Sequence, residues 1–221
     1  MKGILDLEYA LLREKRPDLK YRLRRRTYEI LKTIARFSPH PRVILDLGTA
    51  EGRMLEKIKI KHPSSLCVGI DYSLPLLNYG AKRFPEIKLV RADVQNLRFL
   101  KEETFDVIIA AAVMEHLTYP QKMLSESFRL LKKNGIIIIT SPHPFWEKIA
   151  NLLGLIKGDH QSVMSPKGIF GLCKNVELSI LEYRGFMISP AGMVGELKVE
   201  EILAKIGLDK FFPNQLIVFG K

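Results

Sequence analysis

From Val43 onward the chain alternates short apolar stretches with amphipathic ones, and this alternation constrains the fold more than any other feature. The apolar stretches are nearly continuous, as is typical of strands buried on both faces. The predicted strands are residues 43–47, 66–70, 87–90, 105–111 and 136–140. Helical spacing of apolar residues predicts helices over 53–61, 74–83 and 121–131. The pattern predicts an α/β fold, with a parallel sheet covered by helices on both faces.

The alternation of strands and helices is interrupted at residues 142–175, which predicts an insertion over the carboxyl edge of the sheet. Helices are expected near 147–155 and 167–174. The first of these has an apolar face that we expect to pack on the sheet edge as a lid. A functional interpretation, compatible with this one, adds an apolar or aromatic acceptor in the space below the lid. The residues of this face are Phe145, Trp146, Ile149, Leu152 and Leu153. The chain then closes with a strand near 177–183, a helix near 196–206 and a strand near 215–219.

Ligands of parallel sheets bind beyond the carboxyl ends of the strands, so the residues after each strand are the candidate site. The first predicted strand leads into Asp46, Gly48, Thr49, Ala50 and Gly52. Small residues in this loop let the backbone approach a ligand closely. The G-x-A-x-G spacing differs from the G-x-G-x-x-G of dinucleotide folds and argues against a nicotinamide dehydrogenase. The acidic Asp46 suits a positively charged ligand.

Two further carboxylates follow the second and third strands. Asp71 is placed to accept hydrogen bonds from the hydroxyls of a ribose. Tyr72 beside it could cover an apolar face of a nucleoside, and Asp93 could accept from an adenine amino group. Each acid alone could instead be a helix N-cap. Acids at three successive strand ends together favour a nucleoside ligand.

The successive segments VILDLGTAEG, VGIDYS, VRADVQNL, FDVIIAAAVMEHL and LLKKNGIIIITSP resemble the motifs of the class I, Rossmann-like S-adenosylmethionine-dependent methyltransferases. The resemblance covers residues 43–142 and is closest to the small-molecule type with an E-H-L triplet after the fourth strand. It implies a three-layer αβα sandwich whose seven-stranded, mostly parallel sheet has an antiparallel last strand. It also implies S-adenosyl-L-methionine as the cofactor.

The resemblance also implies roles for individual residues. Gly48, Ala50 and Gly52 would border the methionine part of the cofactor, and Asp71 would hold the ribose. Asp93 and the Val94 amide would read the adenine, and the backbone around Ala111 would border the methionine amino group. The family often has glycine where this chain has Ala50. Alanine is small, so cofactor binding is expected to survive.

Methyl transfer from a sulfonium is a direct displacement, so the protein mainly supplies proximity and alignment. A general base is needed only where the acceptor must lose a proton. The candidates are His116 and Glu115 after the fourth strand and His143 after the fifth. A packing role is the alternative for each. His160 in the insertion is a further candidate for substrate contact.

The net charge of +11 is concentrated near the N-terminus, where residues 1–42 carry 12 basic and 5 acidic side chains. Residues 1–41 are predicted to form a basic helical extension, followed by a methyltransferase domain over 42–221. A helix over 19–37 would carry its apolar stripe on one face, with most of its arginines on the others. Arg22, Arg24, Arg25 and Arg26 could bind RNA. We do not favour this, since no RNA-binding module accompanies them.

The remaining composition narrows the class of protein. Cys67 and Cys173 lie far apart and predict neither a disulfide framework nor a metal site. No apolar run reaches the roughly 18–20 residues of a membrane span, and the N-terminus does not read as a signal peptide. A cytoplasmic methyltransferase with a small-molecule acceptor is therefore expected. The alternatives are an RNA or ribosomal-protein methyltransferase and a non-catalytic S-adenosylmethionine-binding module, and the oligomeric state stays open.

Overall fold

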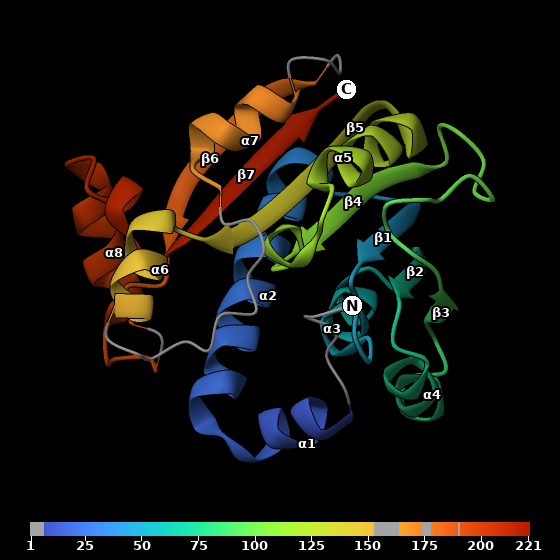
Figure 1. The fold of residues 1–221 in the computed structure, drawn as a ribbon, viewed down its shortest axis with the longest axis horizontal. Helices are drawn as coiled ribbons and strands as arrows, with labels where there is room; N and C mark the ends of the chain where they lie inside the picture. The colour runs from blue at the N-terminus through green and yellow to red at the C-terminus, as the bar shows by residue number, and fades with distance from the viewer. Residues whose placement is uncertain (1–6, 153–163, 174–177, 190) are drawn as a thin grey trace.

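A computed structural model describes residues 7–152, 164–173, 178–189 and 191–221 (Figure 1). Its centre is a seven-stranded sheet in the order β3-β2-β1-β4-β5-β7-β6. The strands are β1 (Val43–Leu47), β2 (Leu66–Asp71), β3 (Lys88–Arg91), β4 (Phe105–Ala111), β5 (Leu131–Pro142), β6 (Ser179–Phe186) and β7 (Asn214–Gly220). Pairing from β3 to β5 is parallel, and β7 is antiparallel to both of its neighbours. The predicted sheet, with its reversed last strand, is confirmed.

Helices cover both faces of the sheet. They are α1 (Leu7–Lys15), α2 (Pro17–Phe37), α3 (Arg53–Lys61), α4 (Leu74–Arg83), α5 (Pro120–Leu130), α6 (Pro144–Leu152), α7 (Pro166–Cys173) and α8 (Glu196–Lys205). Two short 3₁₀ turns, η1 (Met114–His116) and η2 (Asp209–Phe211), lie between them. Successive strand residues point to opposite faces, so Leu45 packs with α5 and α7 while Ile44 packs with α2 and α3.

The strand order reverses between β1 and β4, which are neighbours although β2 and β3 follow β1 in the chain. Such a reversal opens a crevice at the carboxyl ends of the two strands, where ligands of open α/β sheets bind. The loops after β1 and β4 therefore border one crevice. The loop after β2 adjoins it, because β2 pairs with β1.

The N-terminal helices are part of this packing. Ile30 and Ile34 of α2 are fully buried in the same hydrophobic cluster as strand residues Ile109 and Ile138. The helix α1 was not foreseen, since residues 7–15 have only a weak apolar periodicity. Figure 1 shows α1 turned at an angle to α2.

The expectation that the α2 arginines mostly face away from the domain is wrong for Arg25. Its side chain is buried and donates hydrogen bonds to Glu29 (2.7 Å) and to Glu200 of α8 (2.6 Å). A helical wheel could not reveal this, because Glu200 lies 175 residues further along the chain. None of the helices among the described residues is both long and apolar enough to cross a membrane.

Candidate functional site

The loop between β1 and α3 is held in a tight, partly left-handed conformation. Gly48, Ala50 and Gly52 have φ angles of +70°, +53° and +81°. A Cβ atom at Gly48 would collide with the side chain of Val113, which follows β4. Glycine avoids this contact and adopts positive φ without strain. The positive φ angles therefore explain why positions 48 and 52 are glycine. Ala50 also has a positive φ, a conformation that glycine adopts more readily.

Hydrogen bonds join the loops that follow the first three strands. The Gly48 and Thr49 amides donate to the Ile70 carbonyl (2.8 and 3.0 Å), and the Ala50 amide donates to Asp71 Oδ2 (2.8 Å). The Ala92 amide donates to the Asp71 carbonyl (3.1 Å). The structure thus brings the segments that carry Asp46, Asp71 and Asp93 together at one edge of the sheet.

The two outer acids keep part of their hydrogen-bonding capacity for a ligand. Asp71 Oδ1 accepts from the Ser73 amide (2.9 Å), and Asp93 Oδ1 accepts from the Gln95 amide (2.9 Å). Among the described residues, Asp93 Oδ2 accepts no hydrogen bond. Tyr72 is half exposed beside Asp71, and the Arg91 guanidinium lies 5.4 Å from its ring centre. Val94 is buried in the main core cluster.

Asp46 has the most unusual environment of the three acids. Its side chain is buried, and neither carboxylate oxygen makes a hydrogen bond of normal length to a described residue. Burial raises the pKa of Asp46 to about 7; the nearby Thr49 hydroxyl opposes this rise and the Asp71 charge adds to it. A buried carboxyl group without a partner fits a ligand that brings a positive charge or donors.

A second unsatisfied polar group lies near the end of β5. The Thr140 hydroxyl is buried and, within the described part of the chain, has no hydrogen-bond partner. Thr140 pairs with Ala111 in the sheet, and its carbonyl accepts from the Ala112 amide (2.8 Å). Ala112 has a φ of +58°, so the backbone turns sharply just after β4. Unsatisfied groups at the ends of β1 and β5 thus flank the crevice beside Ala111.

The candidate bases occupy different surroundings. Glu115 is buried and His116 half buried in η1, directly after β4. His143 follows β5, and its Nδ1 accepts from the Phe145 amide (3.3 Å) at the start of α6. Burial lowers the pKa of His143. Because Nδ1 is the basic nitrogen of this neutral ring, taking up a proton there would break the hydrogen bond to α6.

The segment predicted to be an insertion, residues 142–175, is only partly described. Phe145 and Trp146 of α6 are exposed and meet edge to face, with ring centres 5.5 Å apart. The Trp146 indole donates to the Phe211 carbonyl (2.5 Å), which ties α6 to η2. His160 and Leu153 lie outside the described residues. No group of His, Cys, Asp or Glu side chains placed to hold a metal ion is found within the described ranges.

Sequence reasoning missed the contribution of α1 to this site. Ala10 packs with Ala50 of the β1–α3 loop and with Leu76. Arg13 donates to the carboxylate of Glu51, which is fully buried in the same loop. The apolar pattern of residues 7–15 carries no signal for this placement, because it depends on an acid 38 residues away.

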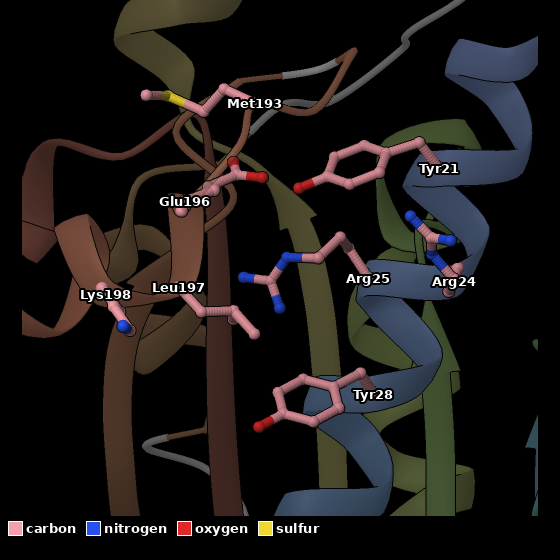
Figure 2. A pocket seen from close by; sticks show the side chains of 9 residues that line it. Tyr21, Arg24, Arg25, Tyr28, Met193, Glu196, Leu197 and Lys198 are labelled. Atoms are coloured by element: carbon pink, nitrogen blue, oxygen red, sulfur yellow. The ribbon is translucent and has the colours of Figure 1, made fainter.

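A separate groove of about 530 Å³ lies between α2 and the start of α8 (Figure 2). Its lining residues are Tyr21, Arg24, Arg25, Tyr28, Met193, Gly195, Glu196, Leu197 and Lys198. Figure 2 shows Arg25 extending from α2 toward α8 between the rings of Tyr21 and Tyr28. None of the predicted cofactor residues lines this groove. Both terminal nitrogens of the Arg25 guanidinium already donate to carboxylates, so Arg25 has little capacity to bind another anion.

Comparison with known proteins identifies the central segment. Residues 45–139 match a family model described as a methyltransferase domain. The chain is 30% identical over 101 residues to a ubiquinone/menaquinone biosynthesis C-methyltransferase of Campylobacter jejuni, covering 43% of each chain. It is 28% identical over 118 residues to a trans-aconitate 2-methyltransferase of Acidovorax ebreus, covering 53% of this chain and 45% of that one. The chain thus spans under half the length of these curated relatives.

Solved structures share the fold over more of the chain. A SAM-dependent methyltransferase from Archaeoglobus fulgidus superposes with a TM-score of 0.68 at 18% identity, covering 96% of this chain and 99% of that one. An S-adenosylmethionine-dependent methyltransferase from Mesorhizobium loti gives 0.68 at 16% identity, covering 89% and 98%. Residues 45–139 therefore match the methyltransferase-domain model, and the chain shares the Rossmann-like fold of solved S-adenosylmethionine-dependent methyltransferases.

Proposed function

We propose that this protein is an S-adenosylmethionine-dependent methyltransferase that acts on a small-molecule acceptor. The observation that carries the proposal is that hydrogen bonds hold together the strand-end segments that carry Asp46, Asp71 and Asp93, beside a loop of small residues. The unpartnered carboxyl group of Asp46 fits the positive charge of this cofactor. Sequence relatives that methylate small molecules support the same assignment.

Each loop of the candidate site would bind a different part of the cofactor. Asp71 would accept from the ribose hydroxyls, with Tyr72 beside the nucleoside. Asp93 and the Val94 amide would hold the adenine. Asp46, Gly48, Thr49, Ala50 and Gly52, with the backbone at Ala111, would surround the methionine end. When bound, S-adenosylmethionine supplies an activated methyl group. The chain then has to position the acceptor and exclude water.

A base is needed only if the acceptor atom carries a proton at the outset. We propose His116 for this role ahead of His143. His116 follows β4 directly, at the reversal of strand order, and imidazole is the side chain best suited to proton transfer near neutrality. The basic nitrogen of His143 already holds the start of α6. Glu115 beside His116 is the alternative base.

The favoured acceptor is a small molecule, with an apolar part packed against the exposed aromatic residues of α6. The RNA alternative loses support from the α2 arginines, because Arg25 is buried in ion pairs. A non-catalytic S-adenosylmethionine-binding module shares every cofactor contact with an enzyme. Only turnover separates these two.

Calorimetry and methyl transfer test the proposal in sequence. The protein is expected to bind S-adenosylhomocysteine and not NAD. Incubation with methyl-labelled S-adenosylmethionine and a cell extract should then place label in the small-molecule fraction. Failure to bind any adenosyl ligand refutes the assignment. Label confined to RNA or protein supports the first alternative, and binding without transfer to any fraction supports the module.

A further inference from the structure

The direction of α2 places its arginines at the same edge of the sheet as the candidate site. The helix ends at Phe37 and leads through a short connection into Val43, where β1 begins. It therefore runs from the carboxyl edge of the sheet toward the amino edge. Ile30 is fully buried in the cluster that contains Ile109 of β4. Arg26 lies one helical turn earlier on the same face, about 6 Å closer to the carboxyl edge.

Arg26 lies among residues of the candidate site. Glu115, just after β4, is the oppositely charged group that acts on it most strongly, and Tyr9, Arg22 and Arg13 act on it as well. Arg13 itself is bound to Glu51 in the loop after β1. Arg26 therefore lies within electrostatic range of Glu115, which follows β4, and of Arg13, which is bound to the loop after β1.

The guanidinium of Arg26 is incompletely satisfied. Its Nε atom is buried and has no hydrogen-bond partner among the described residues, and no described carboxylate forms an ion pair with it. Burial lowers the pKa of Arg26, but a guanidinium stays charged at neutral pH. A partly buried cation whose donors lack acceptors is unfavourable, so a ligand that brings acceptor oxygens would stabilise it.

The neighbouring residue shows how this chain satisfies a structural arginine. Arg25 donates to two carboxylates, Glu29 and Glu200. Glu29 also accepts from Arg184, so these four side chains belong to one hydrogen-bonded network. Arg26 has no such network in the described residues. The Nε atoms of Arg13 and Arg25 are also buried without a partner, so the difference lies in the other guanidinium nitrogens, which in Arg26 make no hydrogen bond to a described residue.

We propose that Arg26 binds the carboxylate of a small molecule in the crevice, an inference that rests on the proposed function. Guanidinium groups present a planar fork of donors that matches the two oxygens of a carboxylate. Two small molecules could bring this group: the amino-acid end of the cofactor or an anionic acceptor. In either case Arg26 is a binding residue, whose charge contacts the ligand carboxylate.

Binding of two adenosyl ligands distinguishes these sources. S-adenosylhomocysteine carries the carboxylate, whereas 5′-methylthioadenosine lacks the whole amino-acid end. Calorimetry would compare the native protein with Arg26→Met, Arg26→Lys and the control Arg24→Met. Arg24 is exposed on the same helix and lines the separate groove, so its replacement should leave both affinities unchanged. If the carboxylate belongs to the cofactor, Arg26→Met should lower the affinity for S-adenosylhomocysteine at least tenfold. The affinity for 5′-methylthioadenosine should stay within twofold of the native value.

A second titration covers the acceptor as the source. Malonate would be added to the protein saturated with S-adenosylhomocysteine. Binding at millimolar malonate in the native protein and Arg24→Met, lost in Arg26→Met, would identify an anionic acceptor site. The Arg26→Lys variant should bind the relevant carboxylate with intermediate affinity, because lysine keeps the charge without the fork. If Arg26→Met does not fold, Arg26→Lys carries both comparisons.

The proposal is overturned if the variants bind all three probes as the native protein does. It is also overturned if the Arg26 variants lose the same affinity for both adenosyl ligands, since that pattern indicates a structural role for Arg26. A native protein that binds neither adenosyl ligand contradicts the proposed function itself. That outcome is visible before any variant is made.

Discussion

The carboxylate of Asp71 accepts a 2.8 Å hydrogen bond from the backbone amide of Ala50, which ties the end of β2 to the loop after β1. Its other oxygen accepts from Ser73 at 2.9 Å. An acid that the sequence places at a ribose therefore also holds the loop expected to border the methionine. Loss of the carboxylate affects both parts of the proposed cofactor site.

Replacement of Asp71 should accordingly weaken binding of S-adenosylhomocysteine severely. We expect Asp71→Ala to lower the affinity by a factor of at least about 100, because two backbone donors and the ligand lose their acceptor. Asp71→Asn should lose less, since the amide keeps one acceptor oxygen. Titration calorimetry measures both affinities.

Asp106 is the matched control, because it accepts from the amides of Arg42 and Val43 at the opposite edge of the sheet. Asp106→Asn should reduce stability and leave the affinity unchanged, and an unchanged affinity in Asp71→Ala contradicts the assigned role.

Cofactor binding should depend on pH through Asp46. With a pKa of about 7, this group is mostly neutral at pH 6 and mostly ionised at pH 8. A cationic ligand favours the ionised form, so the affinity for S-adenosylmethionine should rise with pH. The change in ionised fraction predicts a gain of about tenfold between pH 6 and pH 8. Fluorescence or calorimetric titrations across this range test it, and Asp46→Asn should flatten the profile. Equal slopes in the two proteins would exclude Asp46 as the titrating group.

The same residue should destabilise the ligand-free protein at high pH. Its pKa is raised from an ordinary value of 3.8 to about 7 in the folded state, so folding becomes less favourable as pH rises from about 4 to about 7. The full penalty is of the order of 4 kcal/mol. Asp46→Asn should therefore unfold at higher urea than the native protein at pH 8. The difference should shrink toward pH 4, and a less stable variant at pH 8 contradicts the assigned burial cost.

Gly80 should be intolerant of a side chain because α4 lies against the loop between β1 and α3. A Cβ atom at this position would collide with the backbone carbonyl of Glu51. We expect Gly80→Ala to destabilise the protein by about 1–3 kcal/mol, although alanine is the better helix former. Displacement of the loop should also weaken S-adenosylhomocysteine binding. Gly171 of α7 serves as the control, because a Cβ atom there would meet no other atom within 4 Å. Gly171→Ala should be neutral or stabilising by up to about 1 kcal/mol.

The elements nearest the site were the most predictable. The bounds of β1, β4, α3 and α4 agree with the expected residue ranges. These segments have a strong apolar pattern, and β1, α3 and α4 are each followed within two residues by glycine or proline. The insertion was less predictable: α6 begins at Pro144, three residues before the expected start, because proline is well suited to the first turn of a helix.

The sequence by itself determined the alternating sheet fold and the place of Asp46, Asp71 and Asp93 at successive strand ends. Both follow from local patterns, since parallel strands bring their carboxyl ends to one edge. Only the tertiary structure decided which charges are satisfied. Arg25 pairs with Glu200 across 175 residues, Arg13 pairs with Glu51, and the Nε atom of Arg26 is buried without a described partner. Such pairings depend on how distant helices pack, and the spacing of residues along one helix does not encode them.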